Sequence, residues 1–137
     1  MNIDQEVLKQ LQEQGLISIQ RHPELPLLIH HYIQRCQWEK AWNEHTLMCR
    51  GLITDLDGNV VCRPFPKFFN LGERGITPPS EAFEAFEKVD GSLIVLAHDG
   101  ERWRCTTKGS FNSAQAQWAQ AWLAARDTSA LLVGTTY

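Results

Sequence analysis

A lysine placed two residues before an Asp-Gly pair is the part of this sequence with the clearest chemical potential. Lys88, Asp90 and Gly91 form this Lys-x-Asp-Gly motif at the expected mouth of a β-hairpin. A neutral lysine amine can attack a phosphorus atom, and glycine lets a backbone approach a nucleotide closely. The motif therefore indicates an enzyme that carries a nucleotide covalently on lysine. The alternative is an exposed Asp-Gly turn with a solvated lysine beside it.

Three further cations stand near the ends of expected strands. Arg50 opens the first of two expected hairpins, Lys67 follows it, and Lys108 closes the second hairpin, which Lys88 opens. Four cations in one concave region would hold the polyphosphate of magnesium-bound ATP and stabilise charge on the leaving pyrophosphate. Neighbouring cations also lower the pKa of a lysine from about 10.4, which leaves more neutral amine. The alternative is that these side chains occupy strand ends for solubility alone.

The composition is that of an ordinary globular protein. The chain has 137 residues, 43% hydrophobic and 21% charged, with a formal net charge of -3, which fits one domain or part of a larger one. It has no basic run, so any nucleic acid is held locally or by a part not present here. No apolar run approaches the roughly 20 residues of a membrane span, and the polar, acidic N-terminus is unlike a signal peptide. We therefore expect no membrane partner.

The cysteine and histidine residues show no spacing typical of a metal site. Cys36, Cys49, Cys62 and Cys105 stand in apolar or strand-like surroundings. We interpret them as reduced thiols of a cytoplasmic protein. The five histidines show no ligand spacing either, so no metal-ligating residue is predicted.

Periodicity and turn residues predict an α+β fold with two mainly antiparallel hairpins and helices packed outside. Prolines after the first hairpin interrupt any strand there. Trp38 and Trp42 of the second helix are expected to pack in the core or in a lid rather than to form a base-stacking platform, and the tryptophans of the third helix are expected to be buried. The expected elements, in chain order, are a helix over 4–14 capped by Gly15, a strand over 27–33, a helix over 37–46, a hairpin of 51–56 with 60–62 around Asp57-Gly58, a second hairpin of 92–97 with 103–107, and a helix after Asn112 that begins with an Asn112–Gln115 capping box and buries Trp118 and Trp122.

Five stretches of the sequence together resemble the N-terminal part of ATP-dependent RNA ligases of the T4 RNA ligase 1 type, within the lysine nucleotidyltransferases. Their order and spacing are those of that family, and a weaker likeness runs from about Gly15 to the end of the chain. The stretches are Cys49-Arg50-Gly51-Leu52-Ile53, Asp57-Gly58, Arg63-Pro64-Phe65-Pro66-Lys67-Phe68-Phe69-Asn70, Glu87-Lys88-Val89-Asp90-Gly91-Ser92-Leu93 and Thr107-Lys108-Gly109-Ser110-Phe111.

The resemblance implies a role for each matching residue. Lys88 is similar to the nucleophile that forms lysyl-AMP, and Asp90 and Gly91 shape its loop. The backbone of Glu87 and Val89 would face the adenine.

Four other positions complete the implied nucleotide site. Arg50 resembles an arginine at the nucleotide sugar and phosphate, and Lys67 resembles a lysine at the outer phosphates. Phe69 matches an aromatic position that either packs or stacks. Lys108 matches a second lysine of the pocket.

The family chemistry takes AMP from ATP, passes it to an RNA 5′-phosphate and joins a 3′-hydroxyl, with Mg²⁺ assisting the phosphoryl transfers. The implied partners are thus ATP and RNA ends. The family's downstream glutamate strand, Glu-Gly pair and Lys-x-Lys pair are absent from these residues. We therefore interpret 1–137 as a partial nucleotidyltransferase domain, with an N-terminal region over 1–45 and the nucleotide-binding hairpins and helix over 46–137. Such a chain would bind ATP weakly, have little activity and self-associate through uncovered surface.

Two other functions are compatible with parts of the pattern. One is a non-catalytic remnant that binds a nucleotide or a partner chain. The other is a different lysine nucleotidyltransferase, such as a DNA ligase or a capping enzyme. The stretch from Arg63 to Asn70 argues against the second of these.

Overall fold

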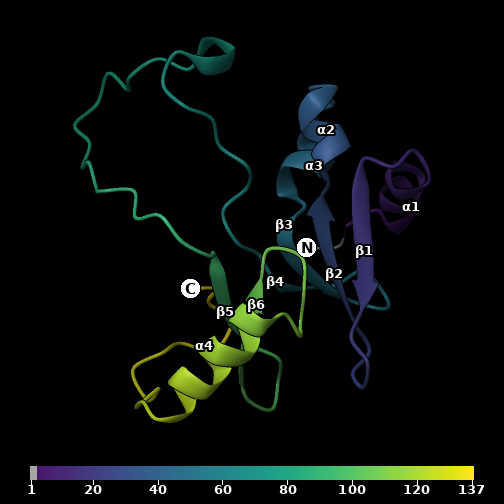
Figure 1. The fold of residues 1–137 in the computed structure, drawn as a ribbon, viewed down its shortest axis with the longest axis vertical. Helices are drawn as coiled ribbons and strands as arrows, with labels where there is room; N and C mark the ends of the chain where they lie inside the picture. The colour runs from purple at the N-terminus through teal and green to yellow at the C-terminus, as the bar shows by residue number, and fades with distance from the viewer. Residues whose placement is uncertain (1–2) are drawn as a thin grey trace.

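The computed structural model describes residues 3–137 as two antiparallel sheets with helices against them (Figure 1). The first sheet has four strands in the order β1-β2-β3-β4, and the second has β5 paired with β6. The α+β class with mainly antiparallel sheets is thereby confirmed. The strands are β1 (Ile17–Arg21), β2 (Leu27–Tyr32), β3 (Arg50–Asp55), β4 (Val60–Cys62), β5 (Ile94–His98) and β6 (Trp103–Thr107).

Both predicted hairpins are present. In the turn between β3 and β4, Asp55 Oδ1 accepts hydrogen bonds from the backbone N–H groups of Asp57 and Asn59, at 3.0 and 2.8 Å. Gly58 has a φ of 86°, which glycine adopts without strain. Strand β1 was not predicted, although it pairs with β2 from Ile17 opposite Tyr32 onward.

The first helix, α1 (Gln5–Glu13), was predicted correctly. Asp4 accepts hydrogen bonds from the first-turn backbone, and Leu8 and Leu11 are buried against the four-stranded sheet. This capping satisfies backbone donors that a helix start would otherwise leave unpaired.

The single helix predicted over 37–46 is wrong, because the segment forms two short helices. These are α2 (Gln34–Trp38) and α3 (Glu44–Met48). Lys40 takes a left-handed conformation, with φ at 53°, and ends the first helix. Asn43 then begins the second, because its side chain and Thr46 form a capping box.

The last helix, α4 (Ala114–Ala124), covers β6, but its tryptophans do not pack in the core as predicted. Trp118 is 67% exposed and Trp122 is 47% exposed, whereas Ala116, Ala119 and Leu123 are buried. The small side chains allow the helix to lie close to the sheet. The N-cap is Ser113, which accepts from the N–H of Ala116, so the predicted Asn112–Gln115 capping box is also wrong.

Gln120 fastens α4 to the backbone of β6. Its Oε1 accepts from the N–H of Cys105 at 2.9 Å, and its Nε2 donates to the carbonyl of Trp103 at 3.2 Å. One side-chain amide thus satisfies two backbone groups on the edge of the second sheet.

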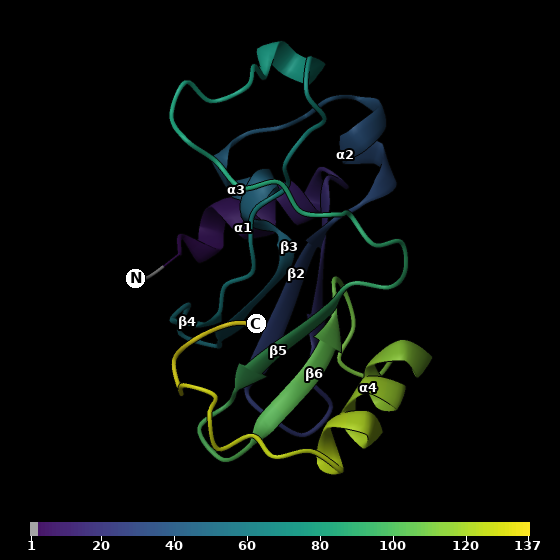
Figure 2. The same ribbon diagram turned by 90° about the vertical axis from the view of Figure 1, so that its left-hand side faces the viewer.

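The second sheet packs on the first through a shared apolar cluster. Ile29 and Ile53 from the first sheet meet Val95 and Ala97 from β5. Tyr137 exchanges two backbone hydrogen bonds with Leu96, at 2.8 and 2.9 Å, so the end of the chain lies along the other edge of β5 (Figure 2). This is the bonding of a directly opposed antiparallel pair.

Residues 63–93 connect β4 of the first sheet to β5 of the second and extend away from both sheets (Figures 1 and 2). We call this segment the arm. Its one helical element is the 3₁₀ turn η1 (Glu73–Gly75). The strand predicted from Ser92 begins at Ile94, so Lys88 lies in the arm and not at the mouth of the hairpin. Several apolar side chains of the arm are exposed: Phe65, Phe68, Leu71, Ile76, Phe83, Phe86 and Val89.

The four cysteines are free and buried, and burial raises their pKa, to about 12 for Cys49 and about 11 for Cys62. Within residues 3–137, no helix has the length and apolar character needed to cross a membrane.

The first prediction concerns a buried histidine. His30 is fully buried, its Nε2 lies 3.0 Å from Thr54 Oγ1, and burial lowers its pKa to about 4. At pH values between about 6.5, the pKa of histidine in the unfolded chain, and about 4, His30 is protonated in the unfolded chain and neutral in the folded chain. The stability contributed by neutral His30 is therefore complete above about pH 6.5 and falls by about 3 kcal/mol as the pH drops to 4.

Urea unfolding between pH 7 and pH 4 measures this loss. The double variant His30→Leu/Thr54→Val replaces both partners with apolar groups and is the matched control. It should show a smaller loss of unfolding free energy than the parent over that interval. An equal pH dependence in both proteins would contradict the assignment.

The second prediction concerns association. The exposed apolar side chains of the arm, among them Phe83 at 65% and Phe86 at 83%, favour contacts between copies of the chain. We expect the sedimentation coefficient to rise with protein concentration, and to rise less in Phe83→Ser/Phe86→Ser. Trp118→Gln on α4 is the control for an exposed aromatic residue outside the arm. A parent protein that sediments as a monomer at every concentration would contradict this prediction.

Candidate functional site

Three of the predicted site cations converge where the two sheets meet. Arg50 is the first residue of β3, Lys108 follows the last residue of β6, and Lys67 lies at the start of the arm. The positive charges of Arg50 and Lys67 both act on Lys108 and lower its pKa, after burial as the larger cause. Arg50 and Lys67 are therefore within electrostatic range of Lys108, although the three cations line separate hollows rather than the single concave region predicted.

An aromatic ring lies beside each of these cations. Lys108 Nζ is 4.6 Å from the ring centre of Tyr32, Lys67 Nζ is 4.3 Å from that of Phe69, and the Arg50 guanidinium is 5.2 Å from that of Phe68. The negative face of an aromatic ring attracts a cation, so these contacts help to hold like charges together. Burial raises the pKa of the Tyr32 hydroxyl, and the positive charge of Arg50 opposes that rise.

The aromatic side chains themselves form a continuous row. The rings of Tyr32 and Trp42 are 5.0 Å apart at 82°, and those of Trp42 and Phe69 are 5.6 Å apart at 78°. Such edge-to-face contacts are favourable beyond simple apolar burial. Phe69 therefore packs against Trp42 as well as lying beside Lys67.

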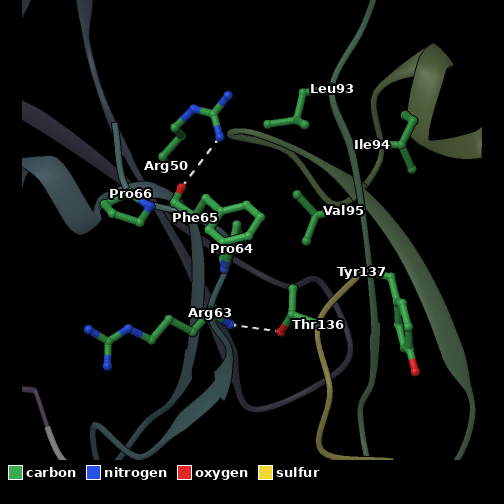
Figure 3. A pocket seen from close by; sticks show the side chains of 10 residues that line it. All are labelled: Arg50, Arg63, Pro64, Phe65, Pro66, Leu93, Ile94, Val95, Thr136 and Tyr137. Atoms are coloured by element: carbon green, nitrogen blue, oxygen red, sulfur yellow. Dashed lines mark hydrogen bonds between the residues drawn. The ribbon is translucent and has the colours of Figure 1, made fainter. Parts of the chain in front are cut away.

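Backbone contacts position two of the cations. The N–H of Lys67 donates to the carbonyl of Leu47 in α3 at 2.8 Å. Arg50 Nη1 donates to the carbonyl of Phe65 at 3.4 Å (Figure 3). The first part of the arm is thus attached to β3 before Pro66 and to α3 after it.

Two glycines allow Lys108 to approach this sheet. A Cβ atom on Gly109 would lie 2.6 Å from the His31 ring, and one on Gly51 would lie 3.5 Å from the Cα of Lys108. Gly51 also has a φ of 94°, which side-chain-bearing residues rarely adopt. Burial, and then the charge of Lys108, lowers the pKa of His31.

A pocket of about 360 Å³ opens beside Arg50 (Figure 3). Leu93 and Val95 line one side of it, and Phe65 and Tyr137 line others. The N–H of Arg63 donates to Thr136 Oγ1 at 3.0 Å and closes the end opposite Arg50. Leu93 also lines the adjoining hollow that contains Lys108 and His31, so both spaces meet at the base of the arm.

The motif lysine does not lie within the cation cluster. The side chain of Lys88 is 78% exposed, and its Nζ lies 3.4 Å from Asp90 Oδ1. Glu87, Val89 and Gly91 are exposed beside it in the arm. The structure therefore brings together Arg50, Lys67, Phe69 and Lys108, and places the segment from Glu87 to Gly91 outside them.

Sequence reasoning missed Tyr32, Trp42 and His31, which contact the cations or the glycine beside them. Tyr32 and His31 are adjacent in β2, and the alternation of a strand places them on opposite faces, so no single face showed them together. The glycine that follows Lys108 was the one sequence feature that could have indicated a close approach of this segment to another part of the chain.

The third prediction tests the coupling of the cations. Replacing Lys67 by methionine removes a positive charge near Lys108 while keeping the side chain long and apolar. The pKa of Lys108 should rise, because the charged form is then less disfavoured. A pH titration of ¹³C-labelled lysines followed by NMR measures the shift, with Lys9→Met on α1 as the control. An unchanged Lys108 pKa in Lys67→Met would contradict the observed cluster.

Comparison with known proteins identifies several to which this chain is similar in sequence. A family model described as RNA ligase matches residues 48–133. The chain is 42% identical over 74 residues to RNA ligase 1 of bacteriophage TS2126, covering 46% of this chain and 18% of that protein. It is 30% identical over 132 residues to the RNA ligase of Rhodothermus phage RM378, covering 77% of this chain and 28% of that protein.

A third relative is a putative bifunctional polynucleotide kinase/RNA ligase of Autographa californica nuclear polyhedrosis virus, 35% identical over 74 residues. That match covers 45% of this chain and 11% of the viral protein. The chain thus spans between about a tenth and somewhat over a quarter of the length of these relatives.

Proposed function

The chain belongs to the RNA ligase family, and from that premise we propose that it binds ATP and accepts AMP on Lys88. The observation that carries the proposal is that Lys67 and Lys108 lie beside the linked rings of Phe69 and Tyr32, with Arg50 acting on Lys108, in a chain of net charge -3. Like charges repel, so a fold that gathers three of them is suited to an anion with several charges. The triphosphate of ATP is such an anion.

In the proposed reaction the neutral amine of Lys88 attacks the α-phosphorus of ATP. A P–N bond forms, the bond from that phosphorus to the bridging oxygen breaks, the electron pair leaves with pyrophosphate, and the amine nitrogen loses one proton to water. Arg50, Lys67 and Lys108 stabilise the negative charge that grows on the leaving group. An oxygen of an RNA 5′-phosphate then attacks the AMP phosphorus, the P–N bond breaks, and the lysine amine takes up a proton. Attack by a 3′-hydroxyl on the RNA 5′-phosphorus, with loss of the hydroxyl proton to water, joins the RNA ends and releases AMP.

Lys88 must move for this step, and the arm has the length to allow it. Leu93 lies at both hollows beside the cations, and Lys88 is five positions earlier. Five residues of extended chain reach about 17 Å, to which the lysine side chain adds its own length. In the proposed bound state the backbone of Glu87 and Val89 faces the adenine, while Asp90 and Gly91 turn the chain beside it.

We propose that magnesium reaches the reaction as the ion carried by the ATP phosphates. Within residues 3–137 no group of three or more His, Cys, Asp or Glu is arranged to hold a metal ion. In the proposed reaction these residues therefore hold no metal ion of their own.

We also propose that the two sheets are part of a nucleotidyltransferase fold and that the protein is cytoplasmic. The antiparallel pairing of the strands is in keeping with that fold, and the four free thiols are in keeping with that location.

One observation favours a second candidate function, which is nucleotide binding without transfer. The side chain of Lys88 is solvent-exposed and pairs with Asp90, whereas the three other cations are already gathered. A non-catalytic binding region would need only those three. Covalent labelling distinguishes the two functions.

The fourth prediction tests the nucleophile. In a protein that continues this chain through the family's downstream glutamate, Glu-Gly and Lys-x-Lys motifs, magnesium and α-labelled ATP should give a covalent adduct on Lys88. The bond would be a phosphoramidate, lost in acid and retained in base. Lys88→Arg keeps a positive charge but has no amine that deprotonates near neutral pH, so it should give no adduct.

Lys67→Ala is the companion variant, because it removes a proposed phosphate contact and leaves Lys88 in place. ATP binding to the chain itself, measured by calorimetry, should weaken by about tenfold or more. Lys9→Ala on α1 is the matched control. Labelling that persists in Lys88→Arg would contradict the nucleophile, and ATP binding without labelling would select the binding-only function.

A further inference from the structure

A second pocket forms where the arm crosses the connection between α2 and α3. It has a volume of about 390 Å³, within the range of small-ligand pockets. Trp42, Lys67 and Phe69 are half-buried in it, and Lys40 and Arg74 are exposed at its rim. We call it the Trp42 pocket. Neither Arg50 nor Lys108 lines it, although Lys67 belongs both to it and to the cation cluster.

The pocket is positively charged. Lys67 Nζ and the Arg74 guanidinium lie 4.3 and 4.9 Å from the ring centre of Phe69, and Lys40 adds a third charge. Within residues 3–137, no ion pair joins any of these three cations to a carboxylate. The acidic residue at the rim, Glu73, accepts a hydrogen bond from the N–H of Asn70 at 3.1 Å.

The backbone at both rim cations is left-handed. Lys40 and Arg74 have φ values of 53° and 52°, and they are the non-glycine residues with positive φ in the described chain. Lys40 follows α2 at a position where glycine is usual. Its N–H bonds to the carbonyl of Gln37 at 3.3 Å, and the N–H of Ala41 bonds to that of Cys36 at 3.0 Å, which is a Schellman motif.

A side chain at such a position costs stability that glycine would not. The Schellman motif explains why a left-handed residue follows α2, but it does not explain why both left-handed positions at this pocket carry a cation rather than glycine. Backbone strain of this kind collects at binding and catalytic sites. The charges at these positions indicate an anionic ligand, and the ring of Trp42 adds an aromatic surface.

We propose that the Trp42 pocket binds a nucleotide of the single-stranded RNA substrate. The base packs against Trp42, and Lys40 and Arg74 contact the flanking phosphates. Cations combined with aromatic side chains are the usual means of holding a single strand. The inference rests on the proposed function for the identity of RNA as substrate. Because Lys67 is shared, an RNA strand held here would lie next to the proposed ATP phosphates.

The test uses glycine as the replacement. Lys40→Gly/Arg74→Gly removes both charges while keeping a backbone conformation that glycine adopts freely, so the variant should melt at or above the temperature of the parent. Fluorescence anisotropy of a short, 5′-phosphorylated, single-stranded RNA measures binding to the 137-residue chain. We expect affinity to fall about tenfold or more. The slope of log affinity against log salt should flatten by about 1.4, or about 0.7 for each lost phosphate contact.

A second variant separates stacking from charge. Trp42→Leu keeps apolar bulk against Tyr32 but removes the aromatic surface, and it should weaken RNA binding about tenfold with an unchanged salt slope. Lys9→Gln on α1 is the control for loss of a lysine outside the pocket. Circular dichroism confirms that each variant is folded. RNA affinity equal to the parent in the folded double-glycine variant, or no RNA binding by the parent, would overturn the proposal.

ATP binding by the same proteins separates this inference from the proposed function. If the two sites are distinct, ATP affinity in the double-glycine variant stays within about twofold of the parent. A parallel loss of ATP and RNA binding would assign the pocket to the nucleotide site and overturn the RNA inference. Conversely, RNA binding that depends on Lys40 and Arg74 in a protein that binds no ATP would support the pocket and refute the proposed function.

Discussion

The close approach of the two sheets is the constraint on which the cation cluster depends. Gly109 meets the ring of His31 where a Cβ would fall within 2.6 Å, and Gly51 faces the backbone of Lys108. Apolar packing of Ile29 and Ile53 against Val95 supplies the attraction that drives the sheets together. The glycines set how closely the two sheets approach each other. That short distance places Lys108, after β6, near Arg50, the first residue of β3.

Gathering cations has a cost, which the fold offsets with aromatic rings. Lys108, Lys67 and Arg50 lie near Tyr32, Phe69 and Phe68 respectively. These rings favour positive charge at their faces, and among the described residues no carboxylate forms an ion pair with any of the three cations. Two of these rings, Tyr32 and Phe69, belong to the row that passes through Trp42 to the pocket at Lys40 and Arg74. One aromatic row therefore supports both proposed anion sites.

Local patterns predicted the hairpins and the first helix well. The Asp57-Gly58 turn and the strands on either side of it are encoded within a few residues, because turn geometry and strand alternation are local properties. The errors came where packing overrode periodicity. Trp118 and Trp122 have helical spacing, but α4 turns its alanines to β6 because small side chains permit the Gln120 contacts with the strand backbone. Residues 37–46 contain a helical pattern that Lys40 and the Asn43 cap divide.

The sequence by itself determined the chemistry that this chain can attempt. The types and order of Arg50, Lys67, Lys88 and Lys108 indicated phosphate and nucleotide handling, because side-chain charge and nucleophilicity are properties of single residues. Only the tertiary structure decided which of them meet. Arg50 begins β3, Lys108 follows β6, and the backbone of Lys67 is hydrogen-bonded to α3, whereas Lys88 lies in a part of the arm whose side chains remain in solvent. Proximity between distant residues depends on sheet packing, which no local pattern encodes.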